Sequence, residues 1–303
     1  MDKALDGTMT TPFTVPAVLR ALRLEQWVKN LLVFMPLMMA PEIVELSLYD
    51  EAFFAFLSFS FCASAVYVLN DLVDLEADRR HPRKRLRPFA SGEVSPRVGW
   101  IVGTTCLIVG LSIAMKLPLL FALVLFVYLV ATTLYSFWLK HVPLVDVLVL
   151  ALLYTGRVIA GGAATNVLPS TWILGFSIFF FLSLAFVKRY AELYAISQND
   201  SALKVRGYFA GDLDLITING TVSGYMSVLV AALYINGDHA SGIYRYPSFL
   251  WLICPLLLYW ISRMWMLAHR GQLHEDPVFF ALRDRASWVV FSLIAVVLLI
   301  ARI

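Results

Sequence analysis

The chain has 303 residues, of which 60% are hydrophobic and 15% are charged, and its mean hydropathy is +0.77. Soluble domains are less apolar and more charged, so the composition excludes an ordinary soluble enzyme, a disordered chain and a secreted disulfide scaffold. The formal net charge of +3 is too small for a nucleic-acid-binding surface, so we expect no nucleic-acid partner. The sequence predicts an all-α polytopic membrane protein.

Nine apolar runs have the length of a membrane helix, which needs about 20 mainly apolar residues. Residues 1–27 have no apolar run typical of a signal peptide, and we expect Val15 to Trp27 to form an amphipathic surface helix. The sequence thus predicts one transmembrane domain over residues 1–303. The nine runs lie near residues 28–48, 51–72, 97–115, 117–138, 142–164, 170–190, 215–236, 247–268 and 285–302.

Nine spans would place alternate loops on opposite sides of the membrane. Most of the 24 Lys and Arg residues fall in the set that contains the N-terminus and the hydrophilic segments 73–96 and 188–214. Because cytoplasmic loops carry an excess of Lys and Arg, we expect the N-terminus in the cytoplasm and the C-terminus outside.

Three aspartates, Asp71, Asp74 and Asp78, follow the second predicted span directly after Asn70. Their separations of three and four place all four residues on one helix face, whereas Glu76 points away. Three like charges on one face repel unless a cation binds, and carboxylate oxygens suit Mg²⁺, which bridges to substrate phosphates. The pattern predicts a Mg²⁺–diphosphate site in which the aspartates are catalytic metal ligands. The alternative is a solvated helix end whose acids pair with the arginines downstream.

A basic segment over residues 79–92 follows the aspartates and contains Lys84, Arg85 and Arg87. Its two prolines restrict the backbone and Gly92 permits a tight turn, so we expect an ordered loop. Arginine binds phosphate through paired hydrogen bonds and lysine as a point charge, which makes these three side chains candidate substrate-binding residues. A topology signal or a patch for anionic lipids would also account for the charges.

The motif Asn-Asp-x-x-Asp-x-x-x-Asp over residues 70–78, followed by His-Pro-x-Lys-x-x-Arg-Pro-x-Ala-Ser-Gly over residues 81–92, resembles the UbiA superfamily of intramembrane prenyltransferases. The segment Gln-Trp-Val-Lys-Asn over residues 26–30, which contains Lys29, is similar to that superfamily too. This resemblance covers nearly the whole chain. It implies a bundle of nine transmembrane helices in the bacterial inner (plasma) membrane, with a cytoplasm-facing catalytic cavity that binds a diphosphate through Mg²⁺.

The segment after the sixth span departs from the common pattern of that superfamily. Prenyl-transferring members have a second aspartate-rich motif there, whereas this chain has Lys188, Arg189, Tyr190 and Glu192 within Lys-Arg-Tyr-Ala-Glu-Leu. An ion pair between Lys188 and Glu192 on one helix face would explain the spacing. The functional interpretation is that this side receives an anion in place of a second metal, as a reaction between two anionic partners requires.

This segment, together with residues 157–162 and 281–285, resembles one branch of the superfamily, the decaprenyl-phosphate phosphoribosyltransferases. That branch transfers 5-phosphoribose from phosphoribosyl diphosphate (PRPP) to a polyprenyl phosphate. The resemblance therefore implies PRPP and a polyprenyl phosphate lipid as substrates and Mg²⁺ as cofactor. It also implies a homo-oligomer such as a trimer.

Arg157 lies inside the fifth predicted span, where a charge is costly unless it faces a polar cavity or a partner. Its side chain would either snorkel towards the outer face or contact a substrate phosphate in a deep cavity. Residues 207–214 would either cap that cavity or link two helices.

Taken together, the residues and the resemblance predict Mg²⁺-dependent transfer of 5-phosphoribose from PRPP to a polyprenyl phosphate, with release of diphosphate. One alternative is a prenyltransferase that moves a polyprenyl group from its diphosphate to an aromatic or other small acceptor. Such an enzyme would need a second acidic cluster, which residues 188–193 do not supply. Another is a non-enzymatic lipid-binding or transport protein, although transporters favour ionisable residues at mid-membrane. The candidate substrate-binding residues are Lys29, Asn70, Lys84, Arg85, Arg87, Arg157, Lys188, Arg189, Tyr190 and Glu192.

Overall fold

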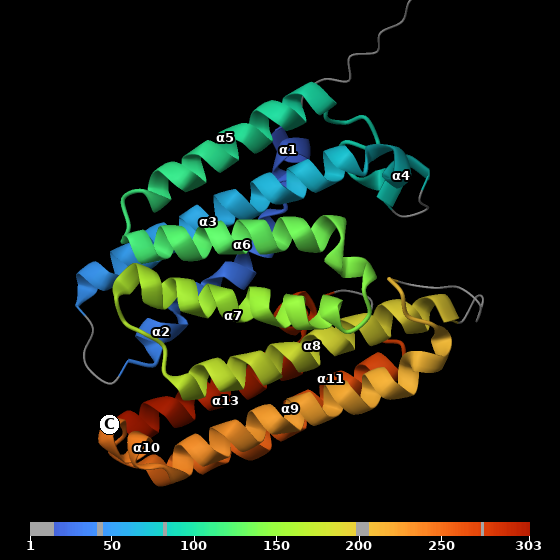
Figure 1. Ribbon diagram of the computed structural model, residues 1–303. Coiled ribbons are helices and arrows are strands. Elements are labelled where there is room, and N and C mark those ends of the chain that lie inside the picture. Colours follow the sequence, from blue (N-terminus) through green and yellow to red (C-terminus); the bar gives the residue numbers. More distant parts are fainter. Residues whose placement is uncertain (1–14, 41–44, 81–83, 198–205, 274–275) are drawn as a thin grey trace, which may run out of the picture.

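The computed structural model describes residues 15–40, 45–80, 84–197, 206–273 and 276–303. All regular elements in these ranges are α-helices or short 3₁₀-helices, labelled η (Figure 1). In chain order they are α1 (Val15–Ala21), η1 (Leu24–Phe34), α2 (Met35–Met38), α3 (Leu46–Val73), α4 (Leu75–Arg80), η2 (Lys84–Leu86), α5 (Pro96–Ala114), α6 (Leu119–Phe137), η3 (Leu139–His141), α7 (Val145–Thr165), α8 (Thr171–Ser197), η4 (Ala210–Asp212), α9 (Leu213–Asn236), α10 (Asp238–Ile243), η5 (Pro247–Leu252), α11 (Ile253–His269), α12 (Pro277–Arg283) and α13 (Arg285–Arg302).

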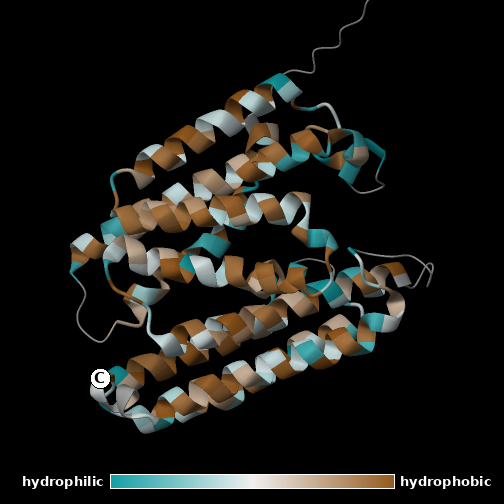
Figure 2. Ribbon diagram, viewed as in Figure 1, coloured by the Kyte–Doolittle hydropathy of each residue, from teal (hydrophilic) through white to brown (hydrophobic). Residues whose placement is uncertain are grey.

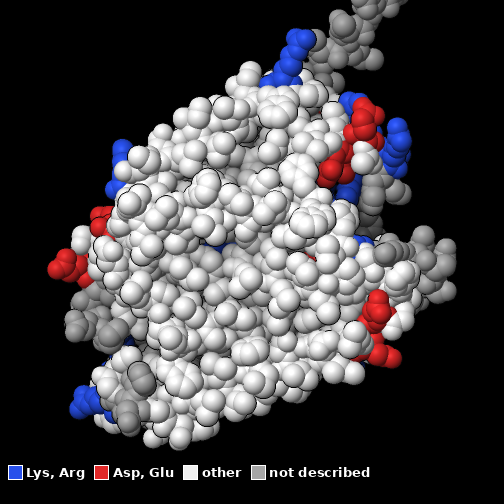
Figure 3. Space-filling view, viewed as in Figure 1, with Lys and Arg blue, Asp and Glu red and all other residues white. Residues whose placement is uncertain are grey.

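Eight helical segments in the described ranges are long and apolar enough to cross a membrane. They begin with α3, α5, α6 and α7 and continue through α8, α9, α11 and α13. Hydrophobic residues dominate these helices (Figure 2), and most of the visible charged side chains lie near the helix ends (Figure 3). The predicted all-α polytopic membrane fold is therefore confirmed.

The remaining predicted span, residues 28–48, is not one continuous helix in the described part of the chain, so nine spans are not shown. Its first part is the 3₁₀-helix η1, and the short α2 follows with Pro36 in its first turn. Lys29 and Asn30 are buried in η1, and burial removes most of the solvation that these polar groups have at a surface. Their side chains instead need partners from other helices, and residues 41–44 lie outside the described ranges.

The predicted amphipathic N-terminal helix is present over a shorter range. In α1, Ala17 and Ala21 are buried and Arg20 is exposed, so the helix has the expected polar and apolar sides. The chain then turns at Arg23, whose φ of +52° is left-handed, and continues as η1. Residues 1–14 lie outside the described ranges.

The bundle has two packed halves that meet along α7 and α8. One apolar cluster joins α3, α6 and α7, and a second joins α8, α9, α11 and α13. In Figure 1, α5, α3, α6, α7, α8 and α9 lie side by side in that order, with α11 and α13 behind α8 and α9. The junction between the halves, where η1 also packs on α7, is where a polar cavity can form without exposing charge to lipid.

Glycines allow the closest helix contacts, as is common between membrane helices. A Cβ atom on Gly161 of α7 would lie 1.9 Å from the carbonyl oxygen of Val33 in η1. A Cβ atom on Gly110 of α5 would similarly lie 2.6 Å from the sulfur of Cys62 in α3. Because Gly161 has no side chain, η1 can lie directly against α7. This contact fixes the positions from which Lys29 and Asn30 project.

We expect Gly161→Ala to destabilise the protein, because the new methyl group meets a backbone carbonyl that cannot move without displacing η1. The loss should be about 1–3 kcal/mol, seen as a lower midpoint of thermal unfolding in detergent. Gly156→Ala in the same helix is the matched control, because no atom lies within 4 Å of the added methyl group. Equal midpoints for the two variants would contradict the proposed close contact.

Candidate active site

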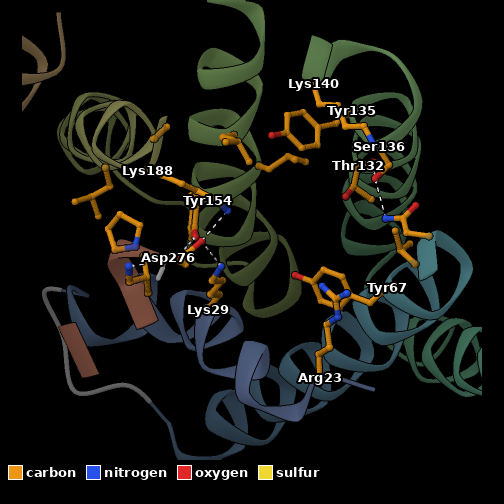
Figure 4. A pocket seen from close by; sticks show the side chains of 18 of the residues that line it. Arg23, Lys29, Tyr67, Thr132, Tyr135, Ser136, Lys140, Tyr154, Lys188 and Asp276 are labelled. Carbon is orange, nitrogen blue, oxygen red and sulfur yellow. Dashed lines mark hydrogen bonds and ion pairs between the residues drawn. The ribbon is translucent and has the colours of Figure 1, made fainter. Parts of the chain in front are cut away.

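A cavity of about 240 Å³ lies where η1, α3, α6, α7 and α8 meet. Eight cationic and three anionic side chains line it, which gives a formal excess of five positive charges. Tyrosines, an asparagine and hydroxyl side chains complete its polar wall (Figure 4). The charged lining residues are Arg23, Lys29, Lys84, Arg87, Lys140, Arg157, Lys188 and Arg206, with Asp71, Asp74 and Asp276.

The acidic motif lies where α3 ends and α4 begins. The backbone N–H of Asp74 donates to the carbonyl of Asn70 (2.9 Å), and that of Asp78 donates to the carbonyl of Asp74 (2.8 Å). These helical hydrogen bonds continue across the break between the two helices. Asn70, Asp71 and Asp74 line the cavity, as their predicted common face requires, whereas Asp78 is 2% exposed and lies outside the lining.

Two of the aspartates pair with arginines. The Nη1 atom of Arg87 donates to Asp71 (3.0 Å) and to Asp78 (2.7 Å), so one guanidinium bridges both carboxylates. Arg23 also donates to Asp71, at 2.7 Å. For Asp71 and Asp78 the structure thus has the downstream-arginine pairing that was the alternative interpretation of this motif. The loop that supplies Arg87 turns at Gly92 with φ +82°, as predicted, and residues 81–83 lie outside the described ranges.

Two carboxylates that line the cavity, those of Asp71 and Asp74, nevertheless have the donor chemistry that suits a magnesium ion. Both arginines donate to Oδ1 of Asp71, so Oδ2 accepts neither of these bonds. Asp74 is 44% exposed, and its nearest ion-pair contact is Lys140 at 4.0 Å. Mg²⁺ is commonly held by one or two carboxylates together with substrate phosphates. In the described residues no cluster of three or more His, Cys, Asp or Glu side chains could hold a metal without such help.

A second charged cluster lies across the cavity from Arg23 and Tyr67 (Figure 4). The ammonium groups of Lys29 and Lys188 both contact Oδ2 of Asp276, at 2.8 and 3.0 Å. Burial acts to raise the pKa of the Asp276 carboxyl, but the two ammonium groups outweigh burial and hold that pKa well below its usual range. Lys188 therefore pairs with Asp276 rather than with Glu192, the partner that helical spacing favours.

Sequence reasoning missed Asp276, which is 88 residues from Lys188 along the chain. Its side chain accepts the N–H of Val278 (3.2 Å) and caps α12, which begins at Pro277. Asp followed by Pro is a typical helix start, so the sequence signal at this position predicts a cap and nothing about a site.

The other residues of the Lys-Arg-Tyr-Ala-Glu-Leu segment do not line the cavity. Arg189 is fully buried, with Nη2 2.7 Å from Oδ2 of Asp146, although this contact is not aligned as a hydrogen bond. Arg189 also forms an ion pair with Glu192. Tyr190 faces α11, where its hydroxyl lies 3.1 Å from Nδ1 of His269. Arg189 and Glu192 thus connect α8 to the start of α7 and to Arg206, and Tyr190 connects α8 to α11.

Of residues 206–212, which precede α9, only Arg206 lines the cavity. Arg206 donates to the hydroxyl of Tyr135 (2.9 Å) and lies 3.4 Å from Glu192. The hydroxyl of Tyr208 donates to Asp146 (2.6 Å) and anchors the segment to the start of α7. No residue of 207–214 lines the cavity, so the structure supports the link between α8 and α9 rather than the cap. Sequence reasoning had not identified Arg206.

Arg157 is 5% exposed and faces the cavity rather than the outer surface. Its Nε donates to the side-chain carbonyl of Asn30 (2.9 Å) and its Nη2 donates to the hydroxyl of Tyr128 (2.7 Å). These contacts hold the guanidinium inside the bundle, so the side chain does not snorkel.

The structure brings together eight of the thirteen predicted site residues around one cavity. Those that line it are Lys29, Asn70, Asp71, Asp74, Lys84, Arg87, Arg157 and Lys188, and those that do not are Asp78, Arg85, Arg189, Tyr190 and Glu192.

The family model described as "UbiA prenyltransferase family" matches residues 31–291. Among curated proteins, the chain is 39% identical over 280 residues to the uncharacterized protein y4nM of Sinorhizobium fredii, and the match covers 91% of this chain and 54% of that protein. It is 35% identical over 280 residues to the decaprenyl-phosphate phosphoribosyltransferase of Mycobacterium tuberculosis, and the match covers 89% of each chain. The chain thus spans about half the length of y4nM and most of the length of the second relative.

Solved structures share the fold at low sequence identity. A UbiA homolog from Archaeoglobus fulgidus bound to GPP and Mg²⁺ superposes with a TM-score of 0.66 at 17% identity. The match covers 93% of this chain and 99% of that one. The helical arrangement described above is therefore that of the UbiA fold.

We expect Asp276→Asn to lower the free energy of unfolding by about 3 kcal/mol, because two neighbouring ammonium groups would lose their shared carboxylate. The native pKa of Asp276 is depressed, so the carboxylate contributes its full stability above the unfolded pKa of about 4 and loses it as the pH falls further. The difference from wild type should therefore be constant from about pH 8 to about pH 5.

Thermal unfolding in detergent at several pH values measures this difference. Asp50→Asn, at an exposed position of α3, is the control with the same chemical change, and its midpoint should match wild type. A destabilisation by Asp276→Asn no larger than that of Asp50→Asn would contradict the two-lysine contact.

Proposed function

The chain belongs to the UbiA prenyltransferase family, and we propose that it transfers 5-phosphoribose from PRPP to a polyprenyl phosphate and releases diphosphate. The observation that carries this proposal is the excess of positive charge in the cavity: five charges among the lining side chains, and three when Asp78 and Glu192, the partners of Arg87 and Arg206, are counted. PRPP carries a diphosphate and a 5-phosphate, and the lipid acceptor carries a further phosphate. Prenyl transfer to an aromatic acceptor would bring a single diphosphate and would balance less of this excess positive charge.

The position after the sixth span supports the same choice. Lys188 lines the cavity there, where prenyl-transferring members are expected to have aspartates for a second metal. A cation at this position favours a second anionic substrate, because an ammonium group repels Mg²⁺ and attracts phosphate. The named relative from Mycobacterium tuberculosis, at 35% identity over 89% of each chain, supports the phosphoribosyl branch.

We assign one side of the cavity to the donor, PRPP, and the opposite side to the acceptor, polyprenyl phosphate. We assign Asp71 and Asp74, with Asn70 beside them, to the diphosphate side, where they would hold Mg²⁺. Bound there, the metal would neutralise negative charge on the diphosphate. Arg23 and Arg87 both contact the carboxylate of Asp71. Their guanidinium groups are placed to donate paired hydrogen bonds to diphosphate oxygens.

On the opposite side, Lys29 and Lys188 would bind the acceptor phosphate. One of its oxygens attacks C1 of the ribose as the bond from C1 to the diphosphate oxygen breaks, so diphosphate leaves with that bonding pair. The acceptor oxygen is already anionic at neutral pH, so this step needs no strong general base. The cationic wall stabilises the charge that passes from one phosphate group to the other.

The remaining assignments follow from this arrangement. We propose one transmembrane domain in the bacterial inner membrane, with the N-terminus and the mouth of the cavity on the cytoplasmic side, the C-terminus outside, and a homo-oligomeric assembly. Lys84 and Lys140, which lie in the connections after α4 and α6, line the cavity. A cytoplasmic mouth fits a soluble donor such as PRPP, and it fits the concentration of Lys and Arg in the loops of that side.

The decisive experiment compares two labelled donors with the purified full-length protein in Mg²⁺-containing detergent buffer. Labelled PRPP and a labelled prenyl diphosphate are each offered with polyprenyl phosphate and with 4-hydroxybenzoate. We expect lipid-extractable label from PRPP with polyprenyl phosphate alone. Label transferred from the prenyl diphosphate to 4-hydroxybenzoate, with none from PRPP, would overturn the proposal in favour of prenyl transfer.

Asp74→Ala tests the proposed metal role in the same assay. We expect turnover to fall at least about 100-fold, because the cavity loses a carboxylate that would hold Mg²⁺ near the leaving group. The side chain is 44% exposed, so the folded state should lose little stability. Glu76→Ala is the matched control, since Glu76 is 77% exposed and points away from the cavity, and it should retain full activity. Normal turnover by Asp74→Ala at saturating Mg²⁺ would refute the metal role.

A further inference from the structure

Arg157 is a buried cation whose hydrogen-bond partners are all neutral. Its guanidinium donates to the amide oxygen of Asn30, the hydroxyl of Tyr128 and the backbone carbonyl of Leu153. In the described part of the chain no carboxylate forms an ion pair with it, whereas Lys29 and Lys188 share Asp276. A guanidinium has five N–H donors, so two remain for a ligand. Because a charge buried in an apolar bundle needs a counter-charge, this site calls for an anion.

The guanidinium is held rigidly before any ligand arrives. Asn30, which accepts from Nε, itself donates to the hydroxyl of Ser60 (3.0 Å) and is therefore fixed between two helices. The rings of Tyr128 and Tyr154 lie 4.9 and 5.3 Å from the guanidinium carbon. A preorganised guanidinium loses little side-chain entropy when it binds phosphate.

Arg157 marks the inner end of the cavity. It lies twelve residues beyond the first residue of α7, about 18 Å along the helix axis. One turn further on, Gly161 lies so close to Val33 that a Cβ atom would be 1.9 Å from its carbonyl oxygen. The contact between α7 and η1 therefore leaves no space between these two elements beyond Arg157.

We propose that Arg157 forms the subsite for the 5-phosphate of the ribosyl donor, an inference that rests on the proposed function. A lipid phosphate at this position would have to direct its long tail away from the tight contact of α7 with η1. The donor is compact and can lie wholly inside the cavity. Its diphosphate end belongs with Asp71 and Asp74, which leaves its 5-phosphate end for Arg157.

This assignment gives each phosphate group its own place around the reacting carbon. The Nζ atom of Lys29 lies 5.7 Å from the ring centre of Tyr154, the same ring that flanks Arg157. The acceptor phosphate at Lys29 and Lys188 would thus lie beside the 5-phosphate and across from the diphosphate. A ribosyl diphosphate without a 5-phosphate would leave Arg157 without its anion, so Arg157 sets donor specificity.

The test measures binding of two probes to the full-length protein in detergent by calorimetry. Ribose 5-phosphate reports the proposed subsite, and inorganic diphosphate with Mg²⁺ reports the aspartate side. In Arg157→Gln we expect affinity for ribose 5-phosphate to fall at least about tenfold, whereas affinity for diphosphate should change by less than about twofold. In the transfer assay the KM for PRPP should rise at least about tenfold, with the KM for polyprenyl phosphate unchanged.

Two milder variants cover the case in which Arg157→Gln does not fold. Arg157→Lys keeps the charge, and Tyr128→Phe removes the hydroxyl that orients Nη2, so both should weaken ribose 5-phosphate binding selectively. Arg245→Gln, which removes an arginine that bonds to the backbone of Ile303 away from the cavity, is the control for loss of charge. It should bind both probes as wild type does.

The outcomes separate this subsite from the proposed function. If wild type transfers phosphoribose but the Arg157 variants bind ribose 5-phosphate normally, or lose affinity for polyprenyl phosphate instead, the subsite is refuted alone. If ribose 5-phosphate binding depends on Arg157 but PRPP is no donor, the proposed function is refuted and a sugar-phosphate site remains.

Discussion

Eight cationic and three anionic side chains line one cavity inside an otherwise apolar helical bundle, and neutralising this charge is the constraint on which the site depends. Each such group is costly in a membrane unless a partner or a polar cavity compensates it. The protein supplies several internal partners. Asp276 pairs with two lysines, and Arg87 bridges two aspartates. Asp78 and Glu192, which contact Arg87 and Arg206 from outside the lining, lower the excess from five to three positive charges among the described residues. Binding of anions would compensate the charge that remains.

An irregular backbone segment places polar side chains inside the bundle while its outer surface stays apolar. Where the sequence has the length of a first membrane helix, the chain instead forms η1 and presents Lys29 and Asn30 inward. Gly161 lets η1 lie directly on α7, so the two polar side chains reach Asp276 and Arg157 from a neighbouring helix. An ordinary α-helix packed at the usual distance would hold these groups further from α7. Local irregularity and close packing are thus part of how the site is built.

Supporting residues behind the wall carry charges that do not enter the cavity. Arg189 is fully buried between Asp146 and Glu192, and Tyr208 ties the segment after α8 to the same aspartate. These contacts fix the start of α7 relative to α8 and bring Arg206 to the cavity edge. Removal of one member of such a buried set would leave an uncompensated charge, so these residues act on the site through position.

The sequence by itself determined the all-α membrane fold, because continuous apolar runs of membrane length have few other solutions. It also located one side of the site, since the spacing of Asn70, Asp71 and Asp74 is a local property of one helix. Only the tertiary structure decided which cations meet those carboxylates, that Arg157 faces inward, and that Asp276 joins Lys188 from 88 residues away. Periodicity constrains neighbours along one helix, whereas contacts between helices depend on packing that no local pattern encodes.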